Sequence, residues 1–359
     1  MPDPIALAAQ LVALDTAGRN EDQALDLIEP LCAAAGLSVE RIPWRPGRSN
    51  LVARWRGGGD LVLAGHVDTV PYDGQRWSRP PLGGDVVDGN LVGRGAADMK
   101  GAVGAMVAAA CAAAEAEVRP FTLVMTAGEE TGCQGAAALR DARVLPADPI
   151  LIVGEATGNR ILLGHKGAVW LKVAATGHAA HGSAPELGVN AIELLARAMQ
   201  SLKALPASRH PHLGRSTVSV GAISGGSQVN LVPDLAEMLV DVRVVQVDDA
   251  ARAAQAIEQA TGSGSVQRFL ELPSVWTDPA SDLTRRVFDI AAVAGQPLEP
   301  QAAAYFTDAS VLADPMNPRV YLFGPGDPAA PHTADESCSV DAITLARDVY
   351  LALLVRLER

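Results

Sequence analysis

The chain has 359 residues, of which 48% are hydrophobic and 4% aromatic, and its formal net charge is −12. This length exceeds what one simple hydrophobic core holds, so about two domains are expected. Because the charge is acidic and the Lys and Arg residues are scattered, neither nucleic acid nor an anionic membrane surface is expected as a partner. We also see no secretory signal and no apolar stretch of the roughly 20 residues that span a bilayer.

The four cysteines share no C-x-x-C spacing and are too few for a disulfide scaffold. They are Cys32, Cys111, Cys133 and Cys338. This pattern favours a reduced, cytoplasmic protein. Cys133 follows Glu130 by three residues, and we interpret it as a small buried residue near a site rather than a reactive thiol.

The first part of the chain alternates segments of helical periodicity with short apolar runs. The predicted helices are Pro4–Thr16, Asp22–Ala35, Met99–Ala116 and Gly135–Arg140, and the predicted strands are Leu51–Trp55, Leu61–Ala64, Phe121–Met125 and Ile150–Val153. Short apolar runs between helices are typical of buried parallel strands. The sequence therefore predicts an α/β fold with a mixed, mostly parallel central sheet flanked by helices.

After Lys166 the pattern changes to strands of a different module. The predicted strands are Ala168–Ala175, Thr217–Ile223 and Glu237–Val247, and the predicted helices are Asn190–Leu205 and Asp249–Thr261. We read these elements as a β-α-β-β-α-β order whose closing strand is given no range, and this order is typical of a ferredoxin-like α+β domain.

The α/β character returns after Pro273, with the helices Ser281–Ala294 and Asp341–Leu357 and the strand Val320–Phe323. We therefore predict a discontinuous main domain, residues 1–167 and 274–359, with residues 168–273 inserted into it.

Acidic residues and histidines follow the predicted strands of the main domain. They are His66, Asp68, Glu129, Glu130, Glu155 and His332, with Asp98 in a glycine-flanked turn. Ligands of open α/β sheets bind beyond the carboxyl ends of the strands, so these side chains are expected at one rim. Five carboxylates gathered there would repel one another unless cations lay among them. The pattern predicts a hydrolase with two divalent metals.

The spacing of these residues suggests which of them bind metal and which orient a ligand or transfer protons. His66 and Asp68 leave a strand end on the same side, so one can bind a metal while the other orients it. Asp98 is suited either to bridge two cations about 3.5 Å apart or to cap the following helix. Glu129 and Glu130 project in different directions, so one can bind metal and the other move protons; a solvated surface pair is the alternative.

Taken together, these motifs resemble a known family. The motifs are Gly-His-Val-Asp-Thr-Val-Pro, Gly-Arg-Gly-Ala-Ala-Asp-Met-Lys-Gly, Gly-Glu-Glu-Thr-Gly, Val-Gly-Glu-Ala-Thr and His-Thr-Ala-Asp-Glu. They span almost the whole chain in order. The chain resembles the dinuclear zinc amidohydrolases that include acetylornithine deacetylase, succinyl-diaminopimelate desuccinylase, carboxypeptidase G and aminoacylase.

The resemblance implies a role for each residue of the rim. His66 and Glu155 would hold one Zn²⁺, Glu130 and His332 the other, and Asp98 would bridge them, with a cis peptide bond to Met99. Glu129 would be the general base and Asp68 would orient His66. Co²⁺ or Mn²⁺ could occupy the same ligands. Glutamate at position 155 is similar to the deacylase and carboxypeptidase branches rather than the tripeptidase branch.

The resemblance also implies a homodimer formed through residues 168–273, the inserted dimerisation domain. His181 would donate to the oxyanion in the partner subunit's site; His178 is the competing choice, and a surface loop histidine is the alternative interpretation. Asn230 and Arg243 match polar positions that bind substrate in relatives, and Lys166 and the backbone of Gly324-Pro325-Gly326 are further candidates for binding a carboxylate. Arg243 is nearly as well explained by pairing with a neighbouring acid.

The expected activity is hydrolysis of the amide bond of an N-acyl-L-amino acid. Tyr305–Ser310 and the Phe-Gly-Pro-Gly-Asp stretch before His332 look most similar to acetylornithine deacetylase, which acts in arginine biosynthesis. Alternatives are succinyl-diaminopimelate desuccinylase, acetylcitrulline or acetyl-lysine deacetylase, and a glutamate-type carboxypeptidase. A metal-free binding protein and a two-metal phosphate-ester hydrolase are hypotheses of other classes; the second lacks a Gly-rich phosphate loop.

Overall fold

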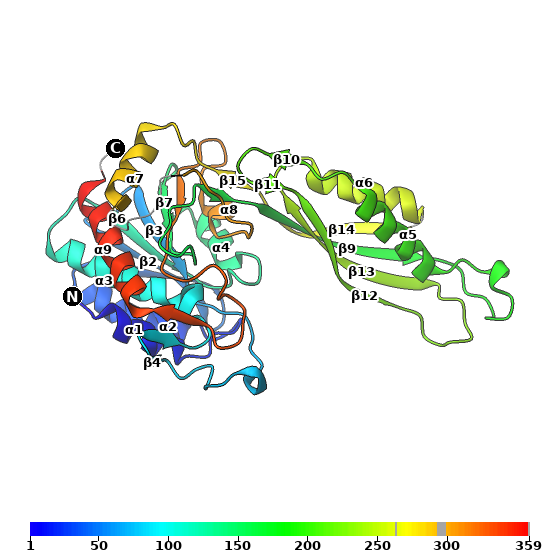
Figure 1. The fold of residues 1–359 in the computed structure, drawn as a ribbon, viewed down its shortest axis with the longest axis horizontal. Coiled ribbons are helices and arrows are strands. Elements are labelled where there is room, and N and C mark those ends of the chain that lie inside the picture. The colour runs from blue at the N-terminus through cyan, green and yellow to red at the C-terminus, as the bar shows by residue number, and fades with distance from the viewer. Residues whose placement is uncertain (263, 293–298, 358–359) are drawn as a thin grey trace. The chain divides into compact units, whose positions relative to one another are not determined.

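The computed structural model describes residues 1–262, 264–292 and 299–357 (Figure 1). The chain forms two compact units. The large unit comprises Met1–Gly164, Val275–Gln301 and Thr307–Arg359, and the small unit comprises His165–Ser274 and Ala302–Phe306. The last of these segments was predicted in the main domain. It joins the small unit because Ala303 bridges to His165 and the Phe306 ring packs edge-on against Trp170.

The large unit is built on a six-stranded sheet of order β1-β2-β6-β3-β7-β16. The strands are β1 (Ser38–Arg45), β2 (Arg48–Trp55), β3 (Leu61–His66), β6 (Phe121–Thr126), β7 (Ile150–Val153) and β16 (Val320–Leu322). Strands β6, β3, β7 and β16 run parallel, whereas β1 and β2 are antiparallel. The predicted α/β class with a mixed, mostly parallel sheet is confirmed. Strand β1 was not predicted, because its side chains are at least partly exposed and form no apolar run.

Helices cover this sheet. They are α1 (Pro4–Val12), α2 (Asp22–Ala34), α3 (Gly101–Glu115), α4 (Gln134–Ala142), α7 (Asp282–Ala291), α8 (Ala309–Leu312) and α9 (Val340–Arg356). Alanine-rich α3 packs against α1 and α9 and is almost wholly buried. Among the described residues one helix, Ala96–Glu115, has the length and apolar composition of a membrane span, and 89% of that window is buried inside the protein. Positions 293–294 of the predicted helix Ser281–Ala294 lie outside the described residues.

Several predicted boundaries differ from the structure, and the following three were predicted too long. Helix α1 ends at Val12 rather than Thr16, whose buried hydroxyl donates to the Val67 carbonyl. Helix α3 begins at Gly101 rather than Met99, because Asp98 and Met99 have non-helical backbone angles within the irregular turn η2 (Ala96–Lys100). Their peptide bond is cis, as the resemblance implied. The strand predicted to reach Val247 ends at Val244, before the turn that precedes α6.

The small unit has the predicted ferredoxin-like order. It contains β9 (Gly167–Thr176), α5 (Ala191–Ala204), β12 (Thr217–Gly225), β13 (Leu235–Val244), α6 (Asp249–Thr261) and β14 (Ser265–Leu272). These strands form an antiparallel sheet of order β12-β13-β9-β14. Buried and exposed residues alternate along β13, so one face of the sheet packs on α5 and α6. Strand β12 lies at an edge of this sheet and is mostly exposed.

Short strands complete the structure. Strands β4 (Asp85–Val87), β5 (Asn90–Val92) and β17 (Ser337–Ser339) form a small sheet, and β8 (Gly164–His165) with β15 (Val275–Trp276) and β10 (Arg209–His210) with β11 (Gly214–Arg215) form pairs. All four cysteines are buried and free.

A buried histidine should make stability sensitive to acid. His165 is fully buried, and burial lowers the pKa of its imidazole from 6.5 to about 4. The unfolded chain therefore binds the proton more readily. The contribution of His165 to the free energy of unfolding is complete above 6.5, the pKa in the unfolded chain, and falls by about 3 kcal/mol as the pH drops toward the folded-state pKa of about 4.

We therefore expect the His165→Phe variant to lose less stability on acidification than the wild type. Urea unfolding of both proteins across this pH window measures the difference, which cancels titrations shared by the two. Parallel curves for the two proteins would contradict the expectation.

Candidate metal centre

The parallel strands bring the predicted rim residues to one edge of the large unit's sheet. His66 ends β3 and pairs in register with Thr126, the last residue of β6. Glu129 and Glu130 follow β6 after a tight turn, and Glu155 follows β7, the other neighbour of β3. Since parallel strands end at the same edge, residues from three separate segments converge there.

Asp98 lies between two histidines. Its Oδ1 is 3.1 Å from His66 Nε2, and its Oδ2 is 3.5 Å from His332 Nε2. Glu130 contacts the same His332 nitrogen at 3.2 Å. The carboxylate of Asp98 thus offers one oxygen to each side, which is the arrangement a bridging ligand requires. It does not cap α3, so the alternative N-cap interpretation is wrong.

The turn that carries Asp98 is held by a buried ion pair. Glu336 Oε1 accepts hydrogen bonds from the backbone N–H groups of Ala97 (2.9 Å) and Asp98 (3.0 Å). Its Oε2 pairs with Arg94 Nη1 at 2.5 Å, and both side chains are almost fully buried. Because these partners are satisfied, the position of Asp98 is fixed by a charge-assisted network.

Asp68 takes a different position from the one predicted. His66 Nδ1 contacts the Asp68 backbone carbonyl at 3.0 Å, whereas the Asp68 carboxylate oxygen is 3.6 Å away. That carboxylate instead accepts the backbone N–H groups of Glu129 (3.1 Å) and Glu130 (3.2 Å). Asp68 therefore orients the imidazole through its main chain and the Glu129–Glu130 turn through its side chain.

Electrostatics mark this cluster as one that needs added positive charge. Burial raises the pKa of Glu129 and of Glu155 well above the usual range, and neighbouring carboxylates raise both further. Burial opposes ionisation of Asp98, but hydrogen bonds from His332 and His66 outweigh it and lower the pKa of Asp98. Contacts with Asp98 and Glu130 raise the pKa of His332 to about 10.

The donor set fits divalent metal ions. Ligand atoms of His66, Asp98 and Glu130 lie within 4.8 Å of one another. His332 contacts two of these residues, and the charge of Glu155 acts on all three. Imidazole and carboxylate donors in this combination suit Zn²⁺, Co²⁺ or Mn²⁺.

Three of the predicted oxyanion and substrate-binding residues lie outside the large unit. His181 is exposed, and its Nδ1 lies 2.7 Å from Ser183 Oγ. Lys166 donates to the Arg215 carbonyl at 2.6 Å, and Asn230 is exposed. All three belong to the small unit.

Two further candidates are already engaged. Arg243 Nε donates to Asp241 at 3.0 Å and its guanidinium lies over the Phe306 ring, so the alternative of a neighbouring acid partner is realised. The Gly324 N–H, in the large unit, donates to Thr157 Oγ1 at 3.0 Å. Its backbone therefore has an internal partner.

Three buried charged groups near this centre were not assigned a role from the sequence: Asp308, Lys100 and Glu336. Lys100 donates to the Leu14 carbonyl at 3.0 Å, and burial lowers its pKa to about 8. Each of the three residues lies in a segment quoted in the sequence analysis. Its role could not be predicted from the sequence, because its partners are distant in the chain.

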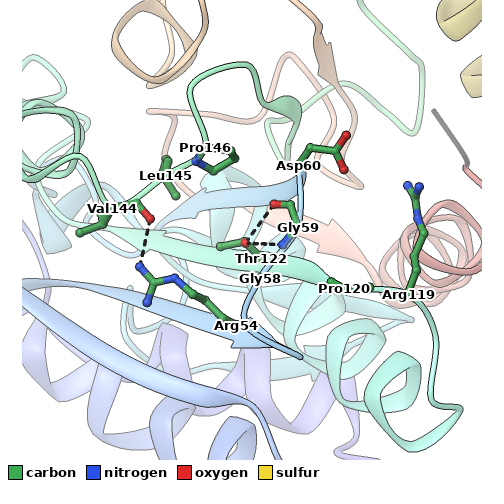
Figure 2. A pocket seen from close by; sticks show the side chains of 11 residues that line it. Arg54, Gly58, Gly59, Asp60, Arg119, Pro120, Thr122, Val144, Leu145 and Pro146 are labelled. Carbon is green, nitrogen blue, oxygen red and sulfur yellow. Dashed lines mark hydrogen bonds between the residues drawn. The ribbon is translucent and has the colours of Figure 1, made fainter.

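A cavity of about 740 Å³ lies at the opposite edge of the same sheet (Figure 2). Its walls come from Gly57–Asp60 and Arg119–Pro120, which precede β3 and β6, and from Arg54 and Val144–Pro146. Arg54 is engaged there with the Val144 carbonyl at 3.0 Å. None of the predicted site residues lines this cavity, so the chemistry of the rim is separate from it.

The sequence of this chain matches a known family. Residues 62–356 match the sequence pattern of the family described as Peptidase family M20/M25/M40. A probable succinyl-diaminopimelate desuccinylase from Staphylococcus aureus is 30% identical, covering 97% of this chain and 97% of that protein. The succinyl-diaminopimelate desuccinylase of Cereibacter sphaeroides is 31% identical, covering 98% of each.

Solved structures share the fold. A tripeptidase from Staphylococcus aureus has a TM-score of 0.81 at 21% identity, covering 98% of this chain and 97% of that one. An aminopeptidase from Bacillus cereus has a TM-score of 0.80 at 20% identity, covering 99% and 98%. A dinuclear metal-binding peptidase of family M20 from Bacillus subtilis has a TM-score of 0.73 at 17% identity, covering 98% and 97%.

Proposed function

This chain belongs to peptidase family M20/M25/M40, and from that premise we propose that it hydrolyses the amide bond of an N-acyl-L-amino acid with two divalent metal ions. The observation that carries the proposal is the Asp98 carboxylate, which meets His66 with one oxygen and His332 with the other. It is an enzyme of the metallopeptidase and amidohydrolase type. Zinc is the proposed metal, with Co²⁺ or Mn²⁺ as substitutes.

We further propose a succinylated substrate of the diaminopimelate type. The similar relatives are desuccinylases and cover this chain from end to end. They support this alternative better than acetylornithine deacetylation, the activity favoured from the sequence. Glu155 is consistent with a deacylase, since the deacylase branch carries glutamate there.

We propose a ligand set that the contacts of the rim and the family resemblance support. His66 and Glu155 would hold one cation, Glu130 and His332 the other, and Asp98 both. Bound cations would lower the pKa of water and polarise the amide carbonyl. Glu129 accepts the proton of the attacking water and returns it to the leaving amine. His181 donates a hydrogen bond to the carbonyl oxygen as negative charge develops there.

We propose that two copies of the chain associate through the small unit in a cytoplasmic homodimer. Strand β12 is an edge strand, and an edge presents unpaired backbone groups to a second strand. Exposed apolar side chains lie on it and on neighbouring β13: Ile223 (48% exposed), Leu235 (55%) and Leu239 (42%). A two-fold pair would cover these residues on both subunits at once.

A substrate panel tests the activity. We expect the metal-loaded protein to release free amine from N-succinyl-diaminopimelate with a higher kcat/KM than from N-acetylornithine, N-acetylcitrulline, N-acetyl-lysine or a dipeptide ending in glutamate. Chelation should abolish release, and Zn²⁺ or Co²⁺ should restore it. A preference for N-acetylornithine would overturn the succinyl assignment alone, whereas no hydrolysis of any amide would overturn the proposed function.

A further inference from the structure

Asp308 is a buried carboxylate without an ordinary structural task. It precedes the short helix α8 and is 3% exposed, yet its side chain does not cap that helix. Its Oδ2 accepts a hydrogen bond from Thr126 Oγ1 at 2.5 Å. Its Oδ1 is buried and accepts no hydrogen bond of ordinary geometry from the described residues, and the Cys133 thiol is a weak donor to this carboxyl. Burying an acceptor in this state is costly, so the position calls for a compensating role.

The place of Asp308 connects it to the candidate metal centre. Thr126 is the last residue of β6, and its hydroxyl also lies 3.3 Å from the carbonyl of Gly65, the residue before His66. Asp308 therefore braces the ends of both strands that lead into the centre. None of the contacts above makes it a metal ligand.

The charge of Asp308 also acts on the centre. Burial is the largest cause of the raised pKa of Glu129 and of Glu155, and the charge of Asp308 is among the charges that raise both pKa values further. Attraction to His66 lowers the pKa of Asp308 itself, against the effect of burial. Asp308 thus repels the carboxylates of a metal-free centre and attracts any cation bound among them.

We propose that Asp308 is a positioning residue that raises the affinity of the centre for divalent metal without binding the metal itself. It acts through Thr126 on the ends of β3 and β6, and through its negative charge on the cation. This inference rests on the proposed metal-dependent function. Carboxylates that support metal ligands in this way change affinity by roughly 10- to 100-fold.

The role predicts opposite effects in two states of the protein. Asp308→Asn keeps the shape of the side chain and an oxygen that accepts from Thr126, but removes the charge. The metal-free variant should melt at a higher temperature than metal-free wild type, because repulsion is relieved. The dissociation constant of Asp308→Asn for the metal should be higher than that of the wild type by about tenfold or more. A residue with a merely structural role would lower the melting temperature in both states.

The experiment uses the full chain, stripped of metal and titrated with Zn²⁺ against a competing chelator at mildly alkaline pH. Thermal unfolding is recorded with and without Zn²⁺. The matched control is Asp249→Asn, which alters a carboxyl that is 4% exposed in the small unit and accepts from the backbone N–H groups of Val245 and Gln246. It should lower stability in both states and leave Zn²⁺ affinity unchanged.

Unchanged Zn²⁺ affinity in Asp308→Asn, or a lower melting temperature of its metal-free form, would overturn the inference while leaving the proposed function standing. Failure of the wild type to bind Zn²⁺ would remove the proposed metal centre, and the role of Asp308 with it. Asp308→Ala, which also breaks the bond to Thr126, should weaken Zn²⁺ binding at least as much as Asp308→Asn.

Discussion

The Glu129→Gln variant is expected to lose activity by a factor of about 10² to 10⁴ while retaining its metal. Glutamine keeps the size of the side chain but cannot accept the proton of an attacking water. Glu129 is 6% exposed, and its backbone N–H is fixed by Asp68 at 3.1 Å. The fold of the turn should therefore survive the substitution. Steady-state kinetics and metal analysis of the same preparation measure both parts of the prediction.

The adjacent Glu130→Gln variant is the matched control. Its carboxylate contacts His332 at 3.2 Å, so we place it among the metal ligands. Removing that charge should lower metal content and activity together, and excess Zn²⁺ should recover part of both. Full activity of Glu129→Gln, or equal metal loss in the two variants, would end the assignment of Glu129 as the base.

The His181→Ala variant is expected to lose kcat by about 10²- to 10³-fold with unchanged metal content. The imidazole is proposed to donate to the carbonyl oxygen only as charge develops there, so KM should change much less than kcat. His181 is exposed on a loop of the small unit and contacts only Ser183 among the hydrogen bonds described for its side chain. Its removal should therefore leave the melting temperature of the protein nearly unchanged. Ser183→Ala is the control for local disturbance of the loop.

Mixing two inactive variants tests whether His181 acts across the dimer. A hybrid of one Glu129→Gln subunit and one His181→Ala subunit contains one site with both groups intact if the histidine comes from the partner. Random exchange of subunits would then restore up to about a quarter of wild-type activity. If the histidine serves its own subunit, no hybrid site is complete and activity stays at the level of the single variants. A protein that remains monomeric at assay concentration would contradict the proposed homodimer.

Much of the fold was predictable because its signals are local. The runs Leu61–Ala64, Phe121–Met125 and Ile150–Val153 are buried on both faces, and each became a strand of the parallel sheet. The small unit was equally clear, since alternation along β13 marks a sheet with one packed face. Helix boundaries were less secure. The helical pattern of apolar residues begins at Met99, but the backbone angles of Asp98 and Met99 are not helical and helix α3 begins only at Gly101.

Roles within the centre were harder to predict because they depend on contacts between distant segments. Asp308 meets Thr126 across 182 residues, and Glu336 meets Asp98 across 238. Neither pairing has a periodicity or spacing that the chain could display. The position of Asp68 is similar: a spacing of two predicts proximity to His66 but cannot distinguish its carbonyl from its carboxylate.

The order of strands and the polar residues that follow them were enough to predict that His66, Asp98, Glu130 and His332 meet at one rim, because parallel strands end together. The atoms that face one another there were settled by folding. Asp98 directs one oxygen to each histidine, and Asp68 turns its carboxylate toward the Glu129–Glu130 turn. Such choices depend on which buried donors and acceptors find partners, and burial arises only when segments far apart in the chain have packed together.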